Sequence, residues 1–171
     1  DDNTAICSGD LLLSAAYSML ASYSNPAKLT QLLTLVHQRT AAAIQGQCAD
    51  LSTKNRSVID IDIDIDLYKK ITAAKSGGLL SLPIEMALLA ADQHSWLIEA
   101  RRAAESFSIA YQIIDDINDL KLDKGQTNQQ QSFNLILLLK ALGHNNAFGI
   151  ARTIALEHLQ VAQDIAVKLP H

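Results

Sequence analysis

Residues that interrupt helices are scarce in this sequence, which has three prolines and seven glycines among 171 residues. Leu, Ala, Ile and Gln are abundant instead, and hydrophobic side chains make up 49% of the chain. This composition favours helices over a sheet. Because a chain of this length can bury a sizeable core, we expect a single all-α domain over residues 1–171.

Cysteines and clustered basic residues are scarce as well. Cys7 and Cys48 lack CxxC spacing and indicate reduced thiols of a cytoplasmic protein. The formal charge is −4 and the Lys and Arg residues are dispersed, so we expect no nucleic-acid partner. The longest uncharged stretches, such as 11–27, contain Ser, Tyr, Asn and Pro, so we expect no transmembrane segment.

Apolar residues recur at helical spacing along most of the chain. The pattern predicts helices over 11–23, 27–51, 79–91, 94–120, 133–142 and 145–168. Taken alone, the alternating run SVIDIDIDIDLYKK (57–70) favours a strand. Because no partner run exists to pair with it, we expect a connection in which Asp64 or Asp66 caps a helix containing 68–75. Gly77-Gly78 should interrupt the helical pattern, and 123–131 should form a polar loop.

Three aspartates stand in the apolar run YQIIDDINDL (111–120). On a helix, Asp115 and Asp119 project within about 40° of each other, with Asp116 beside them. Like charges at this separation repel, so the cluster must be solvated or neutralised. Carboxylates at this spacing also suit Mg²⁺, which accepts one or two of them and fills its remaining sites with water and phosphate oxygens. From spacing alone, a solvated patch and a metal site both remain open.

Four segments together resemble one enzyme family. FSIAYQIIDDINDL (107–120) resembles the second aspartate-rich motif of the trans-isoprenyl diphosphate synthases, the farnesyl and geranylgeranyl diphosphate synthase family. SGDLLLSAA (8–16), GQCADL (46–51) and YKKITAAKSGGLL (68–80) resemble three further segments of that family, in the same order. A lone DDxxD motif is a weak signal, whereas four segments in sequence order are specific.

The resemblance implies an all-helical isoprenoid synthase bundle around a central cavity, represented here without its N-terminal helices. It also implies a prenyltransferase that uses Mg²⁺ to condense an allylic diphosphate with isopentenyl diphosphate, giving a short-chain polyprenyl diphosphate. An apolar cavity would keep water away from the allylic cation. The enzyme would be a homodimer.

The resemblance also assigns roles to individual residues. It makes Asp115, Asp116 and Asp119 metal ligands, with Asp115 and Asp116 also counted as catalytic. Lys75 and Gln112 would act on the diphosphate as catalytic and substrate-binding groups. Two further positions, Ser76 and Gln47, would contact substrate. Without the family match, Lys75 before Gly77-Gly78 is also an ordinary helix C-cap, and Gln47 and Asp50 are also ordinary polar helix surface.

The family's first aspartate-rich motif is the part that this sequence does not reproduce. It is expected upstream of SGDLLL with a loop that carries paired arginines, but Asp1-Asp2 is followed at once by NTAICSGD. Either residues that belong between Asp2 and Asn3 are missing, in which case Asp1 and Asp2 are further metal ligands, or the motif is degenerate. The degenerate case favours a catalytically silent subunit that partners an active synthase. A terpene cyclase of the same fold is a third interpretation, and product length and allylic substrate are left open.

Overall fold

A computed structural model of the chain describes residues 2–54, 64–122 and 133–170. The described residues form helices and connecting turns with no strand among them, which confirms the all-α class. In chain order the elements are α1 (Asp2–Ala21), α2 (Pro26–Lys54), α3 (Ile65–Thr72), the π-helical turn η1 (Ala73–Gly77), α4 (Gly78–Ala90), the 3-10 turn η2 (His94–Trp96), α5 (Leu97–Leu122), α6 (Leu135–Ala141) and α7 (Ala147–Ala166).

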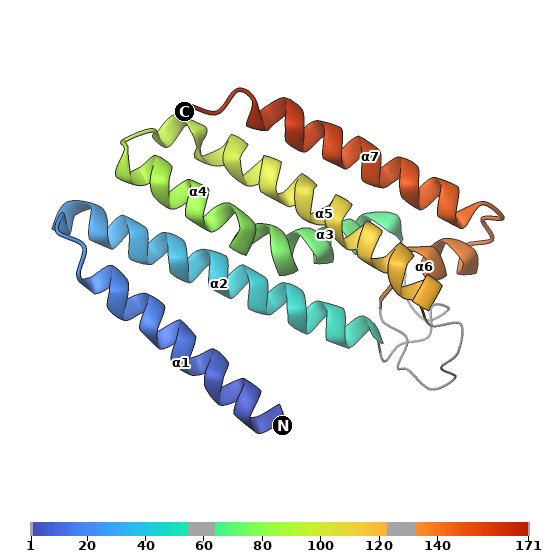
Figure 1. Cartoon of the computed structure of the whole chain (residues 1–171), viewed down its shortest axis with the longest axis horizontal. Helices are drawn as coiled ribbons and strands as arrows, with labels where there is room; N and C mark the ends of the chain where they lie inside the picture. Colours follow the sequence, from blue (N-terminus) through green and yellow to red (C-terminus); the bar gives the residue numbers. More distant parts are fainter. Residues whose placement is uncertain (1, 55–63, 123–132, 171) are drawn as a thin grey trace.

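The five long helices lie side by side in the order α1, α2, α4, α5, α7 (Figure 1). The short helices α3 and α6 contact each other and α5. η1 continues directly from α3 into α4 and contacts both α2 and α5. The N-terminus lies at the same end of the bundle as the C-terminal ends of α2 and α5 (Figure 1).

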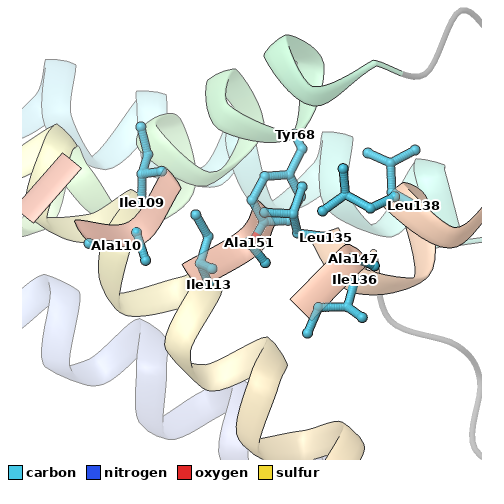
Figure 2. Packing of buried hydrophobic residues seen from close by; sticks show 11 residues of the cluster. Tyr68, Ile109, Ala110, Ile113, Leu135, Ile136, Leu138, Ala147 and Ala151 are labelled. Atoms are coloured by element: carbon cyan, nitrogen blue, oxygen red, sulfur yellow. The ribbon is translucent and has the colours of Figure 1, made fainter. Parts of the chain in front are cut away.

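The main core forms where α3, α5, α6 and α7 meet. Ile113 of α5 and Leu135 and Leu139 of α6 are fully buried, and the ring of Tyr68 from α3 packs among them. Small side chains of α7, Ala147 and Ala151, let that helix approach closely (Figure 2). A second cluster of Leu32, Leu35 and Leu89 joins α2 to α4.

A buried ionic group also ties α2, α4 and α5 together. Glu85 of α4 has none of its surface exposed and accepts hydrogen bonds from Arg39 Nε and Nη2, both at 2.8 Å. Ser81 Oγ donates to the same carboxylate at 2.6 Å and Arg101 Nη2 at 3.2 Å. Burial by itself would raise the pKa of Glu85, but these donors outweigh it and lower the pKa below its ordinary range. Glu85 is therefore a satisfied buried charge.

The element boundaries confirm most of the sequence predictions. The helix after the alternating run begins with Asp64 as N-cap, whose Oδ1 accepts a hydrogen bond from Leu67 N at 2.7 Å. The prediction that Gly77-Gly78 interrupts the helix was wrong, because Gly77 (φ −62°) and Gly78 (φ −62°) are both helical and the chain continues through them. Most of the alternating run (57–63) and the predicted polar loop (123–131) lie outside the described residues.

α1 is longer and more exposed than the sequence indicates. It begins at Asp2 rather than near residue 11, and Leu12 and Met19 are 72% and 76% exposed. With this start, the stretch Asn3–Ala21 is long and apolar enough to cross a membrane by length and composition alone, contrary to our expectation for 11–27. Core helices and signal sequences meet the same criterion, so this is weak support for a membrane span.

Candidate functional site

The structure separates the three aspartates near the C-terminal end of α5. Asp115 and Asp119 are exposed, whereas Asp116 is only 2% exposed. Consecutive helical residues differ in direction by about 100°, so Asp116 turns toward the core face that also carries Ile113, while its two neighbours point to solvent. The cluster therefore consists of an exposed pair and one buried acid.

Three donors satisfy the buried carboxylate of Asp116. Oδ2 accepts hydrogen bonds from the Tyr68 hydroxyl and from the Leu135 backbone N–H, both at 2.8 Å. Oδ1 accepts one from Gln112 Nε2 at 3.0 Å. Burial raises the pKa of Asp116, and these hydrogen bonds offset only part of the rise. Burial and the adjacent Asp116 also raise the pKa of Tyr68, so its hydroxyl remains protonated and donates.

These contacts make Asp116 a joint between three helices. Tyr68 belongs to α3, and Leu135 is the first residue of α6. Asn134, the N-cap of α6, adds a further link by donating from Nδ2 to the backbone carbonyl of Asp116 at 3.1 Å. Asp116 thus fixes the aspartate end of α5 against the neighbouring helices, and its contacts favour this positioning role over the predicted role of metal ligand.

The exposed pair fits a divalent cation better than the full triad does. Mg²⁺ is typically held by one or two protein carboxylates together with phosphate oxygens and water, and Asp115 and Asp119 stand one turn apart on the solvent face of α5. Among the described residues, no group of three or more His, Cys, Asp or Glu side chains is arranged to hold a metal by itself. The metal role of Asp1 and of the Asp2 side chain stays a prediction, since both lie outside the described part of the chain.

Lys75 lies in the π-helical turn η1, next to both α2 and α5. Its ammonium Nζ is 3.1 Å from Asp50 Oδ2 on α2, and about a third of its side chain is exposed. The C-cap explanation for this lysine was wrong, because the helix does not end at Gly77. π-helical turns are frequent at functional sites, which agrees with a substrate-binding role for the Lys75 ammonium.

The continuous run from α3 through η1 brings these groups into one region. Tyr68 anchors the run to α5 through Asp116, and Lys75 anchors it to α2 through Asp50.

The other predicted substrate-binding residues lie nearby. Gln112 lies one turn before Asp116 on α5 and is half-buried, as are Ser76 and Gln47. Lys75 and the aspartate pair are thus carried by elements in direct contact, whereas no hydrogen bond or ion pair joins the side chains of Ser76 or Gln47 to them among the described residues.

Sequence reasoning missed three contributors to this region. Tyr68 was indistinguishable from a core aromatic, and Asn134 from any helix N-cap, because their partners are distant in sequence. Gly46, which packs against the backbone of Lys75, had two signals in the sequence. It opens the GQCADL segment, and it is a glycine in the interior of a predicted helix, where it costs about 1 kcal/mol relative to alanine and needs a packing reason.

Three grooves elsewhere on the bundle are not lined by the predicted site residues. An apolar groove of about 440 Å³ between α4, α5 and α7 is bordered by Ile84, Phe107 and Leu159. A polar groove of about 320 Å³ is bordered by Arg39, Arg101 and the polar side chains of α2. The third, of about 590 Å³, lies where α1 meets α2 and α4. The central cavity expected from the family therefore stays a prediction.

Residues 1–135 match the model of the family described as polyprenyl synthetase. The chain belongs to the polyprenyl synthetase family. This confirms the resemblance drawn from the four sequence segments.

Named relatives and solved structures agree with this membership. The chain is 28% identical over 125 residues to a geranylgeranyl diphosphate synthase of Cyanophora paradoxa, a match covering 70% of this chain and 40% of that protein. It is 30% identical over 131 residues to a dimethylallyltranstransferase of Fischerella ambigua, covering 73% and 37% respectively. The fold matches a geranylgeranyl pyrophosphate synthetase from the archaeon Geoglobus acetivorans with a TM-score of 0.83 at 19% identity, over 99% of this chain and 61% of that one. The chain thus spans less than half the length of the two curated relatives. The match to the solved structure shows that the chain has the all-helical isoprenoid synthase fold.

Proposed function

We propose that the complete protein is a prenyltransferase that joins an allylic diphosphate to isopentenyl diphosphate and releases pyrophosphate. The observation that carries this proposal is the arrangement of Asp115, Asp119 and Lys75 in a chain of the polyprenyl synthetase family. Two exposed carboxylates stand on α5 and one partly exposed ammonium stands on the adjoining η1. This is a site for a diphosphate with its cation.

Each group has a part in the reaction. Breaking the allylic carbon–oxygen bond leaves negative charge on the departing diphosphate, which the ammonium of Lys75 stabilises. Mg²⁺, when bound by Asp115 and Asp119, would supply further stabilisation of the same charge. The new carbon–carbon bond forms to the double bond of isopentenyl diphosphate, and loss of a proton completes the product. Asp116 takes no direct part in these steps and holds the end of α5 in place.

Turnover measurements on matched variants test this assignment. The complete protein with Mg²⁺, an allylic diphosphate and isopentenyl diphosphate should release pyrophosphate, and EDTA should abolish the release reversibly. Asp115→Asn and Asp119→Asn should each lower kcat/KM by on the order of 10²–10³-fold without changing the free energy of unfolding. Asp116→Asn should lower the free energy of unfolding instead. Full activity in both exposed-pair variants would refute the metal site.

An intact protein that is inactive alone would point to the second candidate. The observation behind this candidate is that Asp1-Asp2 is followed at once by NTAICSGD in the sequence, without the third aspartate or the paired arginines of the family motif. The chain would then be a catalytically silent subunit. In that case, adding it to an active synthase should raise the turnover of the mixture.

We further propose a cytoplasmic homodimer. The free, exposed cysteines Cys7 and Cys48 suit a reducing compartment. The apolar side chains exposed along α1 would be covered by α1 of a second copy, because a two-fold axis brings the same surface of both chains together.

A further inference from the structure

η1 is held between α2 and α5 at two glycines. A Cβ on Gly46 of α2 would overlap the backbone nitrogen of Lys75 and would lie 2.8 Å from its Cα. On the other side, a Cβ on Gly77 would lie 2.9 Å from the Cα of Glu105 on α5. These neighbours are backbone atoms, so no side-chain rotation can relieve the contacts. The helices approach η1 as closely as only glycine permits.

The contact at Gly46 falls on the residue that carries the ammonium of the proposed site. Asp50 lies one turn further along the same face of α2 and holds Lys75 Nζ at 3.1 Å. α2 therefore contacts Lys75 at both ends, through Gly46 at its backbone and through Asp50 at its charged head. The backbone contact sets how far the ammonium can reach from α2 toward α5.

We propose that Gly46 is a positioning residue for Lys75, and this inference rests on the proposed diphosphate chemistry. Carbon atoms of neighbouring groups are comfortable at about 3.5–4.0 Å, so a methyl group at position 46 would push η1 away by roughly 1 Å. A displacement of about 1 Å at a group that stabilises a leaving diphosphate costs on the order of 10²-fold in rate. Gly46 acts only through Lys75 and does not itself touch substrate.

Gly78, the first residue of α4 directly after η1, provides a matched control. A Cβ on Gly78 would lie 3.5 Å from the carbonyl oxygen of Arg39, which is an ordinary van der Waals contact. Gly46→Ala should therefore lower kcat/KM for the allylic diphosphate on the order of 10²-fold, whereas Gly78→Ala should change it by about twofold or less. Equal losses in both variants, or no loss in Gly46→Ala, would overturn the proposal.

A double-mutant cycle separates positioning from a general loss of structure. In a Lys75→Met background the ammonium is already absent, so adding Gly46→Ala should cause little further loss of kcat/KM. If the two losses multiply instead, Gly46 does not act through Lys75 and the inference is wrong.

Chemical labelling of Lys75 gives a readout that does not depend on activity. Acylation of individual lysines, followed by mass spectrometry, should show a several-fold change at Lys75 in Gly46→Ala, with exposed Lys140 of α6 as internal reference. Unchanged labelling of Lys75 in the folded variant overturns the inference. A changed labelling rate in a protein that neither binds nor turns over diphosphates leaves the positioning geometry intact and refutes the proposed function. Trimethylamine N-oxide stabilises folded states, so if Gly46→Ala folds only in its presence, the wild type and Gly46→Ala are both labelled with it present.

Discussion

The hydroxyl of Tyr68 and the carboxylate of Asp116 lie 48 residues apart in sequence and 2.8 Å apart in the structure. This hydrogen bond explains how an aspartate is tolerated in an apolar helix face. A buried acid without donors would lose several kcal/mol of hydration, whereas Asp116 has donors on both oxygens. The core around α5 and the aspartate end of the proposed site are therefore one structural unit.

Tyr68→Phe should lower the free energy of unfolding by about 1–3 kcal/mol. The substitution retains the ring, whose centroid lies 5.5 Å from that of Phe133, and removes the hydroxyl that donates to Asp116. Chemical denaturation monitored by circular dichroism measures the change. Tyr111→Phe is the control, because Tyr111 on the same bundle is 62% exposed and should tolerate loss of its hydroxyl. Equal stability of both variants would show that the Tyr68 bond contributes nothing.

Asn134→Ala should destabilise the protein more than the same change at Asn146, the N-cap of α7. Asn134 is buried, and its side chain accepts from Ile136 N and Leu137 N while donating to the carbonyl of Asp116. Asn146 caps α7 from an exposed position through Gly149 N alone. We expect losses of about 2–3 kcal/mol and about 1 kcal/mol respectively in the free energy of unfolding. Equal midpoints in urea would contradict the joint between α5 and α6.

The sequence predicted the helices well because their apolar periodicity is strong and local. The start of α1 was missed because Asn3, Thr4 and Ser8 weaken that periodicity, although the helix already includes them. The Asp64 cap was predicted correctly because capping depends on a few adjacent residues. Local rules therefore fixed element types and part of their boundaries.

Features that depend on contacts between distant segments could not be predicted. Local chemistry makes Gly77-Gly78 a helix stop, but packing against α5 at Glu105 requires a glycine inside a continuing helix. Likewise, spacing placed Asp116 beside Asp115 without revealing which of them faces the core. That choice depends on Tyr68 and on α6, which lie in other parts of the chain.

Leu12→Glu should weaken self-association if α1 forms the proposed dimer contact. Leu12 is exposed on α1. In a two-fold interface the substitution is present in both copies, so it places two glutamates near each other. Sedimentation velocity should show at least a tenfold rise in the dimer Kd, which corresponds to a loss of about 1.4 kcal/mol in the free energy of association. Ile98→Glu on α5 is an exposed apolar control. A wild-type monomer that binds lipid vesicles through α1 would contradict the dimer and support a membrane contact instead.

Glu85→Gln should destabilise the protein at neutral pH, by an amount that shrinks in acid. Glutamine keeps the shape but leaves Arg39 and Arg101 without their counter-charge, and breaking a buried pair in this way costs about 3–5 kcal/mol. Because the folded protein holds the pKa of Glu85 below its ordinary value of 4.5, the carboxylate stabilises the fold above that pH. This stabilisation is lost as the pH falls through the folded pKa.

Urea unfolding of wild type and Glu85→Gln at pH 7, 5, 4 and 3 measures this dependence. The stability difference should be largest at pH 7, still nearly complete at pH 5, and progressively smaller below the ordinary pKa of 4.5. Glu99→Gln is the control, because it removes a solvent-exposed ion pair with Arg102 and should lower the free energy of unfolding by less than about 1 kcal/mol at every pH. A Glu85→Gln deficit that stays constant from pH 7 to pH 3 would mean that lost packing, rather than the buried charge, accounts for the effect.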